Sequence, residues 1–182
     1  WPKNLATLTA TFGEQSFAVI IMFLMFIPAL PFPTGGITHV LEIVVMILCV
    51  EMMLGKQKIW LPKKVQKIPL GFLANKKSVL FIVRKIRWFE KITRSRWPQI
   101  MRNDVFTRFA GFVLLIFALA AFFAVPFTGL DTLPSLAAVA ISIALLFDDI
   151  FIFAIGLFVG VVGLSIMIGA GFASFQLLVR FL

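Results

Sequence analysis

Apolar and polar stretches alternate along the chain in long blocks. Apolar residues fill 17–30, 38–54, 109–125, 133–147 and 150–179, whereas the intervening stretch 55–108 is polar and basic. The run 109–125 approaches the length of about 20 residues with which a helix crosses the hydrocarbon core of a bilayer. The pattern therefore predicts an all-α, polytopic helical membrane protein with a basic segment between its apolar halves.

Proline and glycine break this pattern at two similar places. The sequence Pro31-Phe32-Pro33-Thr34-Gly35 resembles Pro126-Phe127-Thr128-Gly129 apart from one inserted proline. Each copy follows a Phe-rich run and precedes an apolar helix that ends in acid, so we predict two similar broken-helix hairpins, related as parallel repeats about an axis along the membrane normal. The short runs 17–30 and 133–147 also allow re-entrant half-helices. The predicted helix-break turns contain Pro31, Gly35, Gly36, Pro126 and Gly129.

Four segments follow from these breaks. They are a first broken-helix hairpin (1–54), a basic interfacial segment (55–108), a second broken-helix hairpin (109–149) and a C-terminal segment (150–182). The last segment is longer than one untilted span needs, so it is either one tilted helix or a pair of half-helices. Gly156 and Gly160 allow a close helix contact, within one subunit or at the face of a homodimer.

The distribution of charge predicts the orientation. Residues 56–108 hold 15 of the 17 Lys and Arg against Glu90 and Asp104, which gives this segment a net charge of +13. Short basic loops stay on the cytoplasmic side, so we predict a multi-pass protein with segment 56–108 in the cytoplasm. A basic segment flanked by spans favours anionic lipid headgroups as its partner, and we expect no nucleic acid.

Within the basic segment, residues 79–93 have the apolar spacing of an amphipathic helix. Its basic face, together with tryptophans at 60, 88 and 97, is typical of a helix at the membrane surface. Packing against another protein helix is the alternative. The residues expected to contact anionic lipid are Lys63, Lys64, Arg84, Arg87, Lys91 and Arg94.

One ionisable pair enters an apolar helix. Glu42 lies one turn into the apolar run, three residues after His39, so both share a helix face. A charged group at membrane depth is costly unless it is paired or hydrated, so we predict an ion or proton site formed by Thr38, His39 and Glu42, with Asp131 near the equivalent place in the second hairpin. The alternative is that these groups cap or solvate helix starts. For Glu51, beside Lys56 and Lys58, we expect a salt bridge.

Several chemistries are excluded by what the chain lacks. With one His and one Cys it cannot build a zinc site, and we expect no metal and no cofactor. It contains no phosphate-binding glycine loop and no nucleophile elbow. Asp148 and Asp149 have no nucleotide-binding domain around them. We therefore predict that the protein is not an enzyme.

The order of motifs nevertheless resembles one family. Residues 28–67 combine a Pro-rich turn, an apolar helix, Gly55 with basic residues, and then Trp60-Leu61-Pro62 with more basic residues. This is similar to the signature of the ExoD family, named for exopolysaccharide synthesis, and the second half of the chain matches it loosely. Family members usually show a Glu-Arg-Asp-Gly-like end to the second helix, where this chain has Phe147-Asp148-Asp149-Ile150.

The resemblance implies a bacterial inner-membrane protein tied to exopolysaccharide production. It supplies no catalytic residues. Two functions stay open: a small transporter or ion-coupled protein, and a non-transporting accessory protein that binds anionic lipid or an acidic partner among the polysaccharide-synthesis proteins.

Overall fold

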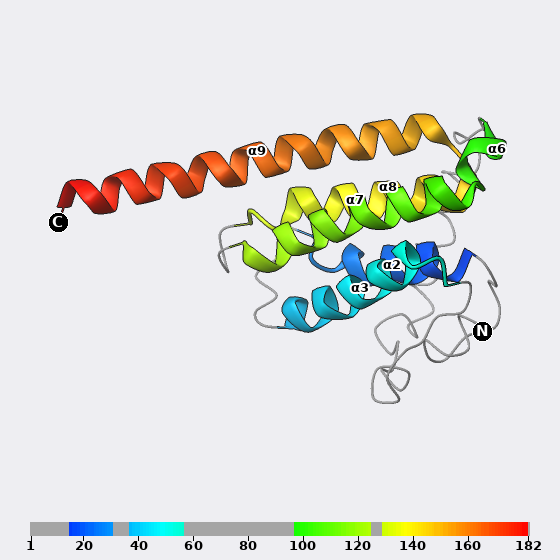
Figure 1. Cartoon of the computed structure of the whole chain (residues 1–182). Coiled ribbons are helices and arrows are strands. Elements are labelled where there is room, and N and C mark those ends of the chain that lie inside the picture. Colours follow the sequence, from blue (N-terminus) through cyan, green and yellow to red (C-terminus); the bar gives the residue numbers. More distant parts are fainter. Residues whose placement is uncertain (1–14, 31–36, 57–96, 125–128, 182) are drawn as a thin grey trace.

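The computed structural model describes residues 15–30, 37–56, 97–124 and 129–181. These residues form helices and no strand, which confirms the predicted all-α fold. The elements in chain order are α2 (Ser16–Phe26), α3 (Ile37–Met53), α6 (Pro98–Met101), α7 (Asp104–Phe123), α8 (Thr132–Phe147) and α9 (Ile150–Phe181) (Figure 1). Residues 57–96, which make up most of the basic interfacial segment, and the first 14 residues lie outside the described part of the chain.

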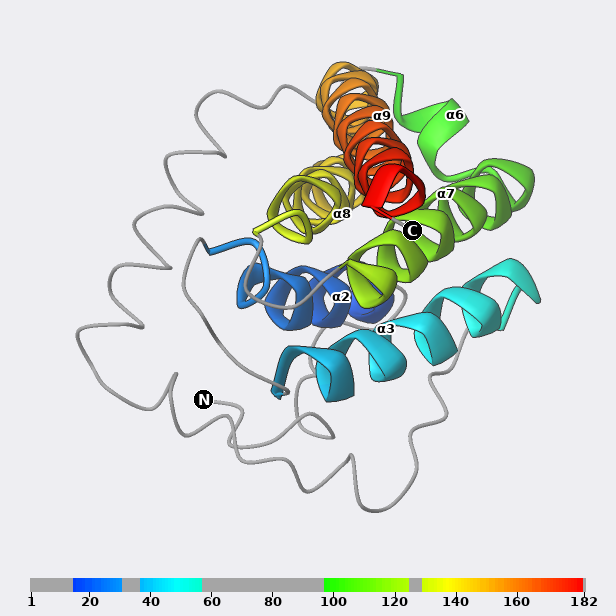
Figure 2. The same cartoon turned by 90° about the vertical axis from the view of Figure 1, so that its left-hand side faces the viewer.

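Four helices form a ring. α2 packs against α3, α3 against α7, α7 against α8, and α8 back against α2, so α2 faces α7 and α3 faces α8 across the ring (Figure 2). α9 packs outside this ring on α8 and also touches α7. We call the end that holds Lys56, Arg102 and Arg108 the basic end, and the opposite end, where α3 and α8 begin, the turn end.

Large apolar side chains fill the interior of the ring. Those that are almost completely buried include Ile20, Ile21, Leu48, Leu114, Phe117 and Ile141. Other large apolar side chains point outwards, and Phe123, Phe158 and Ile168 are each 70% exposed. α7 and α9 are long and apolar enough to cross a membrane. Because the outer faces of these two helices are apolar as well, lipid is the environment that suits them.

α2 ends well before its neighbours. It has 11 residues and a length of about 16 Å, whereas the 20 residues of α7 span about 30 Å. Pro28 follows the last turn and has no N–H to donate to the carbonyl of Leu24, so the helix cannot continue regularly. α2 therefore lines only the basic half of the ring.

α3 and α8 end in the same way. Gly55 and Asp148 have left-handed backbones, with φ of +71° and +53°. The following residue of each donates its N–H back to a helix carbonyl, Lys56 to Glu51 and Asp149 to Ala144. This is the six-to-one bond of a Schellman cap, which satisfies a carbonyl that the helix leaves open. Each residue of the α3 cap corresponds to the residue 93 positions later in the α8 cap, so that Gly55 corresponds to Asp148.

The C-terminal segment is one continuous helix. α9 runs from Ile150 to Phe181 without a break at its glycines, so among the described residues the structure has the single helix and not the helix pair. Gly156 and Gly160 lie against Ile141 of α8 and Phe117 of α7, so their faces are occupied within the subunit. Gly169 has no neighbour within 4 Å, and α9 extends past the ring there (Figure 1).

Candidate functional site

Glu42 lies inside the ring on α3. Its relative exposure is 0%, and neither carboxylate oxygen has a hydrogen-bond partner among the described residues. The basic group that contacts it is the imidazole of His39, whose Nδ1 lies 3.6 Å from Oε2, beyond hydrogen-bonding distance. This burial argues against the alternative in which Glu42 is solvated at a helix start. Since an unpaired buried carboxyl costs free energy, its presence calls for a functional explanation.

His39 lies between Glu42 and the surface. Its side chain is 34% exposed, and its ring packs against that of Phe122 on α7 with centroids 5.4 Å apart. The Thr38 hydroxyl, which is buried, lies 3.5 Å from Nδ1. The three residues that the sequence placed together are therefore neighbours at the turn end, and the imidazole offers a route for a proton between Glu42 and the outside.

α8 supplies two further polar groups near the turn end. Asp131 occupies the N-cap position of α8, but its side chain makes no capping hydrogen bond. It lies close enough for its charge to act on that of Glu42. Ser135, one turn further along α8, is 0% exposed, and its hydroxyl has no partner in the described structure.

The sequence analysis missed Ser135, because a serine in an apolar helix usually donates to the carbonyl four residues back. Ser142 on the same helix does so, with its hydroxyl 2.8 Å from the carbonyl of Ala138. Nothing in the local sequence separates the two serines clearly. Only the three-dimensional structure shows that one is satisfied and the other is not.

Three acidic residues at the basic end have partners, namely Glu51, Asp148 and Asp149. Lys56 Nζ lies 3.0 Å from Glu51 Oε1, the salt bridge expected from the sequence. Arg102 donates to Asp148 Oδ2 from Nε and Nη2, at 2.9 and 2.8 Å. The Asp149 carboxylate accepts the N–H of Phe151 at the start of α9, at 2.9 Å.

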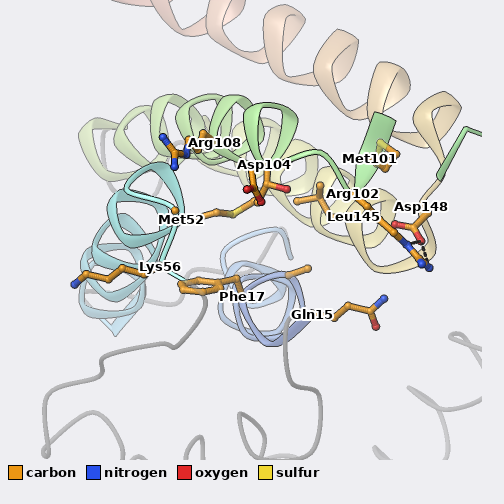
Figure 3. A pocket seen from close by; sticks show the side chains of 13 residues that line it. Gln15, Phe17, Met52, Lys56, Met101, Arg102, Asp104, Arg108, Leu145 and Asp148 are labelled. Carbon is orange, nitrogen blue, oxygen red and sulfur yellow. Dashed lines mark hydrogen bonds and ion pairs between the residues drawn. The ribbon is translucent and has the colours of Figure 1, made fainter. Parts of the chain in front are cut away.

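A pocket of about 550 Å³ opens at this end (Figure 3). All four ring helices line it, through Phe17 of α2, Met52 of α3, Asp104 and Arg108 of α7, and Leu145 of α8. Its lining combines charged groups with apolar side chains. The sequence analysis did not single out Arg102 or Arg108, because their roles depend on helices that are distant in the chain.

Other predicted site residues lie outside the described part of the chain. They are the turn residues Pro31, Gly35, Gly36 and Pro126 and the lipid-contact residues Lys63, Lys64, Arg84, Arg87, Lys91 and Arg94. Gly129 is described, and its φ of +70° fits a turn residue that glycine adopts readily.

The chain matches known proteins along nearly its whole length. A family model described as "Exopolysaccharide synthesis, ExoD" matches residues 2–169. An uncharacterised protein of Synechocystis sp. is 23% identical over 146 residues, which cover 80% of this chain and 68% of that protein. No solved structure matches.

Proposed function

The chain belongs to the ExoD family of exopolysaccharide synthesis, and on this premise we propose that it is an ion-coupled membrane protein whose coupling site contains Glu42 and His39. The proposal places the protein in the bacterial inner membrane with segment 56–108 in the cytoplasm, as the charge distribution predicts. Its task is transport that serves exopolysaccharide production.

The burial of Glu42 carries this proposal. A fully buried carboxyl that accepts no hydrogen bond from a described residue is stable only when it holds a proton or lies beside a cation. Such a group would be replaced by an apolar one if packing were its only role. α2, which packs against the helix of Glu42, is short, and transporters bind coupling ions at the carboxyl ends of such short half-helices.

The predicted internal repeat supports the same function. When α3 and α8 are aligned by their caps, 93 positions apart, Glu42 falls on Ser135 and Leu48 on Ile141, and all four are 0% exposed. α2 and α7 then correspond too, and each corresponding pair lies across the ring. Two broken-helix repeats around a central axis are typical of secondary transporters, whose substrate site lies between the repeats.

The test is flux in proteoliposomes. The purified chain is reconstituted with a pH-sensitive dye inside, and gradients of protons, sodium and potassium are imposed in turn. We expect flux from the wild type and a loss of at least tenfold in Glu42→Gln, because glutamine keeps the size of the side chain but can neither ionise nor carry the proton.

Glu51→Gln is the matched control. Glu51 lies nine residues further along the same helix and is paired with Lys56, so its replacement should leave flux within about twofold of the wild type. Absence of flux from folded, oriented wild type, or equal flux in wild type and Glu42→Gln, would contradict the proposal.

A second function, that of a non-transporting accessory protein, is favoured by the basic end. Lys56 and Arg102 line the pocket, and they lie close in the sequence to the two ends of the basic segment 57–96. Segment 57–96 carries 12 Lys and Arg against one Glu. Such a surface attracts anionic headgroups or an acidic partner protein.

Charge reversal separates the two functions. We consider a triple variant that combines Arg84→Glu, Arg87→Glu and Lys91→Glu. If the protein is an accessory protein, this variant should abolish exopolysaccharide production, and the variant protein should no longer bind anionic vesicles. The same triple variant should retain most flux if the protein is a transporter, because these residues are remote from Glu42 in the sequence and are expected at the membrane surface.

A further inference from the structure

We propose that the Glu42 site binds a monovalent metal cation, and that Ser135 supplies a ligand to it from the opposite half of the ring. This inference rests on the proposed function only in its use of Glu42 as the coupling site. It adds Ser135, which the sequence did not indicate, to the residues of the site. It also adds an alkali cation as the ligand, which a mechanism that moves only protons does not need.

The first support is the inventory of unsatisfied atoms. Among the described residues, three buried side-chain polar atoms have no partner, namely both carboxylate oxygens of Glu42 and the hydroxyl oxygen of Ser135. All three are oxygen acceptors, and no described Lys or Arg pairs with them. Oxygen atoms that face no donor are the ligands that hard cations prefer.

Glu42 and Ser135 also lie at a similar distance from the basic end, measured along the helix axes. Glu42 lies 11 residues before Met53, the last residue of α3, and Ser135 lies 12 residues before Phe147, the last of α8. Both are therefore about 17–18 Å from the basic end. α2 spans about 16 Å from the same end, so its carboxyl terminus reaches the level of both side chains.

The end of α2 adds to the attraction for a cation. The carboxyl terminus of a helix carries a partial negative charge. At the end of α2 the carbonyls of Met25 and Ile27 accept the N–H groups of Ala29 and Leu30. Pro28 leaves the Leu24 carbonyl without its regular helical donor. Transporters coordinate sodium with unwound backbone carbonyls and the carboxyl-terminal ends of half-helices.

The charge of the site sets the valence of the ion. One fully buried carboxylate, that of Glu42, balances one positive charge, and Asp131 adds a weaker attraction from the surface of α8. No three His, Cys, Asp or Glu of the described chain gather into a group that could hold a metal ion. A divalent ion would require more carboxylates than this part of the structure provides.

Thermal unfolding in detergent tests the inference. The midpoint of the wild type is measured at one pH and constant ionic strength while choline is replaced by sodium, and in a second series by potassium. We expect one of the two ions to raise the midpoint by about 5 °C at saturation. The variant Ser135→Ala should need about tenfold more of that ion, and Glu42→Gln should not respond at all.

Ser142→Ala is the matched control, since Ser142 is equally buried on the same helix but is already bonded to its own backbone. Its midpoint should respond to the ion as the wild type does. Binding of radioactive sodium or potassium to the wild type, competed by the unlabelled ion, provides a measurement that needs no variant to fold.

Two outcomes would overturn the inference. One is a wild-type midpoint that follows pH but no alkali cation, together with no radioactive binding. The other is a Ser135→Ala titration that superimposes on that of the wild type. Both outcomes can be told apart from a failure of the proposed function. A protein that binds sodium but shows no flux would support the cation site and contradict transport. A protein that conducts protons but binds no alkali ion would support transport and contradict the cation site.

Discussion

The two ends of the helix ring treat their acidic side chains differently. At the basic end Glu51, Asp148 and Asp149 are mostly buried, and each has a short contact with Lys56, Arg102 or a backbone N–H. At the turn end Glu42 is buried more completely and has no hydrogen-bond partner in the described structure. Acidic residues therefore stabilise helix termini at the basic end of the ring, whereas at the turn end an acidic residue forms a site without hydrogen-bond partners.

This difference teaches where to look for function in an apolar protein. Buried charge that is paired satisfies the fold, and its removal should destabilise the protein. Buried charge that is unpaired costs stability, and its removal should stabilise the protein at the expense of activity. The sign of a stability change thus separates the two ends.

The largest effect is expected for Glu42→Met in buffer without alkali cations. A methionine fills a similar volume without an unsatisfied carboxyl, so the free energy of unfolding should rise by about 2 kcal/mol. Denaturant unfolding in detergent measures it. Glu51→Met should shift the free energy in the opposite direction because it leaves Lys56 without its partner. A loss of stability in both variants would remove the distinction between the ends.

A smaller effect is expected for Arg102→Ala. The Asp148 side chain is 10% exposed. The substitution removes its ion-pair partner, Arg102, which lies 46 residues earlier in the chain. We expect the free energy of unfolding to fall by about 1 kcal/mol, since the arginine itself is 72% exposed and partly screened. Arg108→Ala, at the same pocket but without a carboxylate partner among the described residues, should change it by less than half as much. Equal effects would show that the Arg102 pair is not structural.

The smallest contrast compares two glycines with left-handed backbones. Gly55→Ala and Gly129→Ala should each lose about 1 kcal/mol of stability, because alanine is strained at φ near +70°. A methyl group at Gly55 would also meet the Arg108 guanidinium at 2.8 Å, whereas Gly129 has only a hydroxyl at 3.9 Å. The loss should therefore be somewhat greater at Gly55 in thermal unfolding. A larger loss at Gly129 would indicate that the turn end is the more tightly packed of the two.

Much of the architecture was predictable from the sequence. The apolar runs gave the helices and the two long segments able to cross a membrane, and the pair Glu51–Lys56 followed from five-residue spacing at a helix end. The predicted neighbourhood of His39 and Glu42 followed from helical periodicity. The C-terminal segment stayed ambiguous because glycines permit a break but do not require one, and packing against Ile141 and Phe117 keeps α9 continuous.

What the sequence determined by itself is local: where helices form, how their ends are capped, and which class of environment surrounds them. These properties depend on neighbours within a few residues and on composition. The tertiary structure alone decided that Arg102 reaches Asp148 and that Ser135 is unsatisfied while Ser142 is not. Those outcomes depend on which helices meet across the ring, and partners that are tens of residues apart leave no pattern within either helix.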